Sequence, residues 1–112
     1  MAHCEFQTFA DGPVIRVALS GELCLGTAED AEDELRRTEW ERYEQIVLDL
    51  RGVRFIDARG LLVIFGLHER CSETGTCLAI LPGPRNIQRL FILTGLVERL
   101  PFVNAADGNR PA

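Results

Sequence analysis

The stretch QIVLDLRGVRFIDARGLLVI, residues 45–64, decides the fold. Its first six residues are mostly apolar, which is typical of a short strand in the middle of a sheet. The break DARG at residues 57–60 precedes an apolar block with helical spacing, so we expect a helix over 58–74 that ends at Gly75. Asp57 stands where an N-cap carboxylate accepts a backbone N–H. The stretch therefore predicts a strand that leads into a buried helix.

The remaining chain alternates further strands and helices. Strands are expected at 5–9, 13–19, 45–50 and 77–81, with a possible last one at 100–103, and helices at 28–40, at 58–74 and from Pro84 to Gly95. Thr27 is the expected N-cap of the first helix, with Asp30 completing a capping box. Strands that alternate with helices imply right-handed crossovers and a largely parallel sheet. We expect one α/β domain over 1–112, with a core over about 5–104 and a flexible tail at 105–112.

Composition excludes several classes of function. The chain has 112 residues, of which 46% are hydrophobic and 26% charged, as in a small globular domain. The apolar run at 61–67 is too short to cross a membrane, and the N-terminus lacks the pattern of a secretion signal. A net charge of -5 argues against a nucleic-acid partner. We therefore expect a cytoplasmic protein without direct membrane insertion.

No catalytic or metal-binding pattern is visible. The glycines form neither a phosphate-binding loop nor a dinucleotide fingerprint. The four cysteines do not pair in a CxxC motif, and small buried thiols are the favoured interpretation; they are Cys4, Cys24, Cys71 and Cys77. A redox switch between Cys71 and Cys77 is a weaker alternative. His68 lies on the apolar helical face with Leu61, Ile64, Phe65 and Cys71, which favours a structural role. We expect no enzyme activity, no metal and no cofactor.

Three stretches together resemble a known family. They are VALSGELCLGTAEDAEDEL (17–35), QIVLDLRGVRFIDARGLLVI (45–64) and RNIQRLFILTGLVERLPFV (85–103). In this order and spacing they are similar to STAS domains, and above all to the bacterial anti-sigma-factor antagonists. The resemblance covers residues 14–103. It implies a four- to five-stranded, mostly parallel mixed sheet with three to four helices mainly on one face. It also implies a non-enzymatic protein that binds a kinase-type anti-sigma factor and so releases a sigma factor.

The sequence departs from that family at its regulatory position. The family typically has Ser or Thr directly after the aspartate, and the partner kinase phosphorylates it to switch binding off. Here the position is Ala58, so the resemblance does not extend to a phosphoacceptor. Arg59 takes the place of a frequent Ser or Thr, and Leu62 the place of a frequent Gly. Thr27 is a candidate substitute phosphosite, although the N-cap interpretation of this residue is stronger.

We therefore expect a partner-binding surface at the start of the helix at 58–74 and in the neighbouring loop. Its candidate residues are Cys24, Leu25, Thr27, Asp57, Ala58, Arg59 and Leu62. Arg59 is either a cation for a partner carboxylate or a solvated side chain, and Leu62 either an apolar contact or, slightly favoured, a core residue. A pair between Glu22 and Asp57 would need tertiary contact that the sequence does not show. The alternative function is a STAS subunit of a lipid- or anion-transport or stress-sensing assembly. The chain is expected to be a monomer or weak homodimer.

Overall fold

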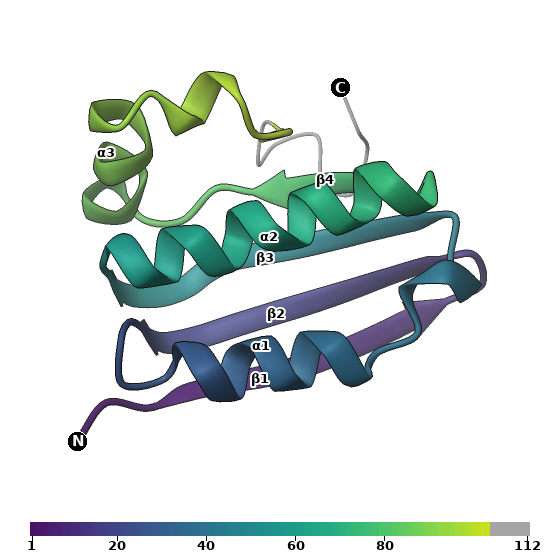
Figure 1. The fold of residues 1–112 in the computed structure, drawn as a ribbon, viewed down its shortest axis with the longest axis horizontal. Coiled ribbons are helices and arrows are strands. Elements are labelled where there is room, and N and C mark those ends of the chain that lie inside the picture. The colour runs from purple at the N-terminus through teal and green to yellow at the C-terminus, as the bar shows by residue number, and fades with distance from the viewer. Residues whose placement is uncertain (104–112) are drawn as a thin grey trace.

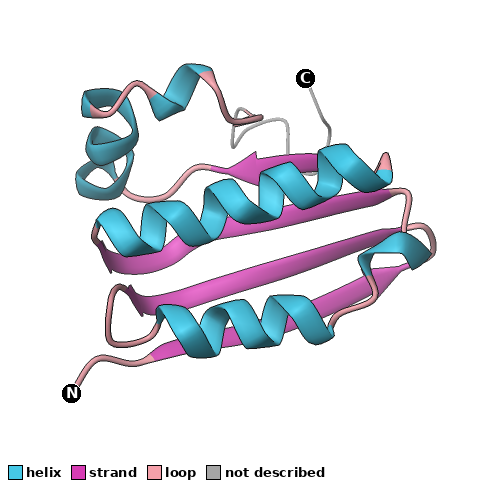
Figure 2. Ribbon diagram, in the orientation of Figure 1, coloured by secondary structure: helices cyan, strands magenta, loops and turns pink. Residues whose placement is uncertain are grey.

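The fold is a single sheet with helices packed against it (Figures 1 and 2). The computed structural model describes residues 1–103; the tail expected at 105–112 lies outside the described residues. The strands are β1 (Cys4–Asp11), β2 (Val14–Leu23), β3 (Gln45–Ile56) and β4 (Cys77–Leu81), and the α-helices are α1 (Ala28–Arg37), α2 (Ala58–Thr74) and α3 (Arg85–Leu93). Short 3-10 turns follow at Trp40–Arg42 and Leu96–Glu98.

The sheet is mixed, as expected. Its strand order is β1-β2-β3-β4; β1 pairs antiparallel with β2, and the other two pairs are parallel. The last strand expected at 100–103 is reduced to one parallel bridge between Ile80 and Phe102 at the outer side of β4. Within residues 1–103 the sheet thus has four strands, the lower of the two numbers expected.

The main core lies between the sheet and the helices. α1 and α2 lie side by side over one face of the sheet, and α3 stands beyond the β4 end of it (Figure 1). Alternation along β3 turns Ile46, Leu48 and Leu50 toward the helices, where all three are at most 1% exposed. From α3, Ile87 and Phe91 join the same core. The expectation of helices mainly on one face is confirmed.

The first three strands are longer than predicted, and the first helix is shorter. β2 continues to Leu23 and β3 to Ile56, and these ends pair with each other beyond two register shifts. The extra residues at the shifts lie on β3 and interrupt the alternating pattern of that strand. The helix expected over 28–40 ends at Arg37, and Trp40 begins a separate 3-10 turn. The indole N–H of Trp40 donates to the Leu35 carbonyl at 2.8 Å, which fixes that turn against the end of α1.

The second helix has the predicted limits. Asp57 is its N-cap, and Gly75 closes it in the left-handed conformation, with a φ of 76°. Of the predicted face, Leu61, Ile64 and Cys71 are buried, whereas Phe65 and His68 are only half-buried. The other buried residues of α2 are Gly60, Val63 and Leu67. The buried face of the helix is therefore rotated away from Phe65 and His68.

Candidate functional site

The candidate site lies where α2 begins, beside the loop that joins β2 to α1. Asp57 connects the two segments. Its carboxylate accepts one hydrogen bond from the Gly60 backbone N–H and another from the Leu25 backbone N–H, each at 3.0 Å. The first bond is the predicted helix cap. The second ties the loop to the helix across 32 positions of sequence, and no local pattern predicted it.

These bonds also set the charge state of Asp57. Partial burial opposes ionisation of its carboxyl, but the donors at Gly60 and Leu25 outweigh burial and hold its pKa below the usual range. The carboxylate is therefore ionised at neutral pH. It lies at the N-terminal end of α2, where the helix dipole favours a negative charge.

Gly60 brings the first turn of α2 directly onto the end of β2. A Cβ at this position would lie 2.1 Å from the backbone carbonyl oxygen of Leu23 and 2.8 Å from Ile56. The Asp57 N–H also donates to the same Leu23 carbonyl, at 3.4 Å. Backbone contact of this kind leaves no room for a side chain, so Gly60 positions the site through packing.

Exposed side chains surround this cap. Leu25 is 76% exposed and Leu62 is 61% exposed, and Ala58 is exposed between the cap and Leu62 along the chain. The expectation that Leu62 belongs to the core was wrong, because α2 turns Leu61 and Val63 inward on either side of it. We call Leu25, Asp57, Ala58 and Leu62 the cap surface. Phe55, at the end of β3, is 51% exposed and was not among the predicted site residues.

Arg59 is already paired within the chain. Its guanidinium makes two hydrogen bonds to the Glu32 carboxylate on α1, at 2.6 and 3.2 Å. This contact lowers the pKa of Glu32 and raises that of Arg59. Arg59 is therefore not a freely solvated side chain. It joins α1 to α2 instead.

Thr27 and Cys24 support the loop from inside. Thr27 is only 6% exposed, and its hydroxyl donates to the Glu22 carbonyl at 2.7 Å and accepts from the Cys24 N–H at 3.0 Å. It occupies the N-cap position of α1 without a side-chain capping bond, so the predicted capping box with Asp30 is wrong. Cys24 is 9% exposed. The side chains of both residues are turned away from solvent.

Other predicted features lie outside the cap surface. Glu22 does not pair with Asp57; it pairs with Arg54 and accepts from the His3 backbone N–H at 2.9 Å. All four cysteines are free, and the exposed Cys77 departs from the expectation of buried thiols. Within residues 1–103 no cluster of His, Cys, Asp and Glu could hold a metal ion, and no helix there is long and apolar enough to span a membrane.

Comparison with known proteins agrees with this architecture. Residues 7–107 match the STAS domain family. The chain is 32% identical over 90 residues to the anti-sigma F factor antagonist of Paenibacillus polymyxa, covering 80% of this chain and 77% of the relative. An anti-sigma factor antagonist structure from Mycobacterium paratuberculosis has a TM-score of 0.78 at 23% identity, covering 89% and 85% of the two chains.

The same fold occurs in a transport protein. A sulfate transporter family protein from Wolinella succinogenes gives a TM-score of 0.69 at 24% identity, over 82% of this chain and 75% of that one. At this identity the likeness shows the fold alone, whereas the Paenibacillus polymyxa relative is similar in sequence over most of its length. The chain therefore belongs to the STAS domain family, within its non-enzymatic branch of anti-sigma-factor antagonists.

Proposed function

We propose that this protein binds an anti-sigma factor through the cap surface, that it thereby releases a sigma factor in the cytoplasm, and that phosphorylation at position 58 does not switch it. The observation that carries the proposal is an exposed Ala58 at the capped start of α2. The relative from Paenibacillus polymyxa, an antagonist of an anti-sigma factor, supports the choice of partner.

The chemistry of the cap surface suits a protein partner. Leu25 and Leu62 offer two large exposed apolar side chains, which lose contact with water when a partner covers them. Between them the loop is held by the Asp57 carboxylate, so the surface is ordered before binding. A preformed surface lowers the entropic cost of association.

Ala58 removes the means of switching this surface off. A phosphate at the start of α2 would add about -1.5 to -2 charges at neutral pH. Those charges would lie beside the ionised Asp57 and inside the interface. The alanine methyl group cannot accept a phosphoryl group, so a kinase-type partner has no acceptor at this position. Thr27 is a poor substitute, because its hydroxyl is buried and hydrogen-bonded.

A capture experiment tests the partner and the surface together. The tagged protein is immobilised and exposed to extract of its source bacterium, and the retained proteins are identified by mass spectrometry. We expect an anti-sigma factor to be retained, and Leu62→Glu to reduce its retention at least about tenfold by burying an unpaired charge. Ser72→Glu is the matched control, because it adds the same charge to an exposed position near the other end of α2. Retention of transporter subunits in place of an anti-sigma factor would refute the proposal.

A second experiment tests the missing switch. Purified partner and ATP are added to the wild-type protein and to Ala58→Ser. We expect ATP to leave the wild-type complex intact and to dissociate the Ala58→Ser complex as the new hydroxyl is phosphorylated. Phosphate found on the wild-type chain near residue 58, with loss of binding, would contradict the proposal.

A further inference from the structure

A second surface lies at the opposite side of the sheet from β4, along β1. This strand is eight residues long, pairs with β2 on one side only, and forms one edge of the sheet among residues 1–103 (Figure 1). It contains no proline, bulge or lysine, which are common means of blocking an edge strand. Six of its eight residues are exposed. Its outer backbone groups are therefore open to another strand.

The hairpin that joins β1 to β2 decides which backbone groups point outward. Asp11 pairs with Val14 across a two-residue turn, so this pair is a hydrogen-bonded one. Hydrogen-bonded and non-hydrogen-bonded pairs alternate along an antiparallel ladder. The N–H and C=O groups of Phe6, Thr8 and Ala10 therefore point away from β2.

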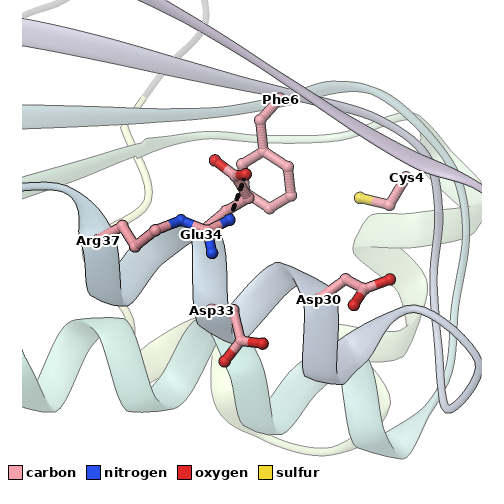
Figure 3. Close-up of a pocket in the computed structure, with 6 residues that line it drawn as sticks. All are labelled: Cys4, Phe6, Asp30, Asp33, Glu34 and Arg37. Carbon is pink, nitrogen blue, oxygen red and sulfur yellow. Dashed lines mark hydrogen bonds and ion pairs between the residues drawn. The ribbon is translucent and has the colours of Figure 1, made fainter.

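A groove follows this edge on the side of α1. Its cavity of about 400 Å³ lies between β1 and α1 and is lined by Cys4, Phe6, Asp30, Asp33, Glu34 and Arg37 (Figure 3). A smaller cavity of about 200 Å³ shares Cys4 and Asp30 and extends to the loop at Gly26. The groove thus has an apolar wall on the strand and an acidic wall on the helix.

The charge of the groove selects the kind of strand that fits. Its lining residues carry three carboxylates and one guanidinium. Asp33 and Glu34 are paired with neighbouring arginines of α1, whereas the Asp30 carboxylate has no partner within residues 1–103. A second copy that paired through its own β1 would bring another acidic α1 to the same side, and like charges would repel. A basic strand would be attracted.

We propose that β1 accepts an extended basic segment of a partner protein as an additional antiparallel or parallel strand, with its basic side chains in the groove beside α1. The outer N–H and C=O groups of Phe6, Thr8 and Ala10 provide the backbone pairing. Asp30 and its acidic neighbours on α1 provide the preference for arginine or lysine. This surface is distinct from the cap surface, so the inference does not rest on the proposed function.

The probe is a peptide of alternating threonine and arginine, acetyl-TRTRTRT-amide, added to the full isotope-labelled chain. Amide hydrogen exchange is followed by NMR. We expect the peptide to slow exchange at the N–H groups of Phe6, Thr8 and Ala10. The N–H groups of Gln7 and Phe9, which already pair with β2, should change little. The matched peptide with glutamate in place of arginine should bind at least about tenfold more weakly, because each arginine contact becomes a repulsion.

Two sets of variants distinguish the contribution of backbone hydrogen bonds to peptide binding from the contribution of the charges on α1. Thr8→Pro removes one outward N–H and should weaken peptide binding about tenfold. Asp30→Asn combined with Asp33→Asn should weaken it about threefold, and this pair keeps the test valid if the proline disturbs β1. Glu69→Gln combined with Glu73→Gln, at two exposed positions of α2, is the charge-matched control and should have no effect.

Several results would overturn the inference. One is an unchanged exchange pattern at saturating basic peptide, and another is equal binding of the acidic peptide. A third is a dimer of the free chain that Thr8→Pro dissociates, because this would show that a second copy occupies the edge. Leu62→Glu should leave peptide binding unchanged. Failure of the anti-sigma factor capture and failure of this inference can thus be told apart.

Discussion

Replacing Asp57 with alanine should detach the loop that carries Leu25 from the start of α2. The wild-type carboxylate accepts from two backbone N–H groups, those of Gly60 and Leu25, each at 3.0 Å. Alanine removes both acceptors at once. Water can reach the released N–H groups, since Asp57 is only partly buried, so the loss is smaller than for a fully buried group.

The size of the effect follows from the two bonds. Loss of an N-cap aspartate costs about 1 kcal/mol. The bond to Leu25 in this partly exposed position adds about 0.5–1 kcal/mol. We therefore expect Asp57→Ala to lower the free energy of unfolding by about 2 kcal/mol, which corresponds to a fall in Tm of about 8 °C for a domain of this size. Asp57→Asn keeps one acceptor oxygen and should lose only about half as much.

Urea unfolding followed by the fluorescence of Trp40 measures this difference, because Trp40 is the single tryptophan and is 1% exposed. The folded-state pKa of Asp57 is depressed, so its contribution is complete above the unfolded-state pKa of about 3.9 and is lost as the pH falls through the folded-state value. The deficit of the alanine variant at pH 7 should thus shrink in acid. Equal stability of the alanine and asparagine variants at pH 7, or a deficit independent of pH, would refute this account of the site.

Three further predictions concern other parts of the fold. Gly60→Ala should destabilise the domain by about 1–3 kcal/mol in urea unfolding, because its Cβ would meet the Leu23 carbonyl at 2.1 Å; wild-type stability would show that the contact can relax. At pH 8 a thiol reagent should label the exposed Cys77 first and Cys71 last, since burial raises the pKa of Cys71 to about 11; equal rates by mass spectrometry would contradict this. Arg59→Ala should lower Tm more at low salt than at high salt, because its ion pair with α1 is screened by salt; a salt-independent loss would argue against an electrostatic contribution.

Periodicity predicted the parts of the fold that depend on local pattern. The limits of α2 follow from a carboxylate cap at Asp57 and a glycine at position 75, and both signals act within one turn of the helix. The C-terminal ends of β2 and β3 were missed for the opposite reason. Their pairing passes register shifts after Ala18 and Gly21, and the extra residues that these shifts place on β3 disturb the alternation that identifies a strand.

The position of the cap at the candidate site was predicted, but the contacts around it were not. The sequence placed Asp57 at the cap, and the structure adds the bond to Leu25, which depends on how the loop after β2 folds back. Arg59 meets Glu32 from 27 positions away, and such a pair leaves no local trace. Helical spacing placed Leu61 on the buried face, but the apolar character of Leu62 favoured the core, whereas the packing of α2 leaves Leu62 61% exposed.

The fold itself places no evident demand on the residue at position 58. The side chain is exposed, Asp57 provides the cap, and Gly60 makes the close contact with β2, so neither structural role falls to Ala58. Serine in the first turn of a helix costs only a few tenths of a kcal/mol relative to alanine. A hydroxyl could therefore stand here with little loss of stability. The choice between alanine and serine at this position then affects mainly what a partner can do to the surface, which is why Ala58→Ser separates regulation from folding more cleanly than any substitution in the cap.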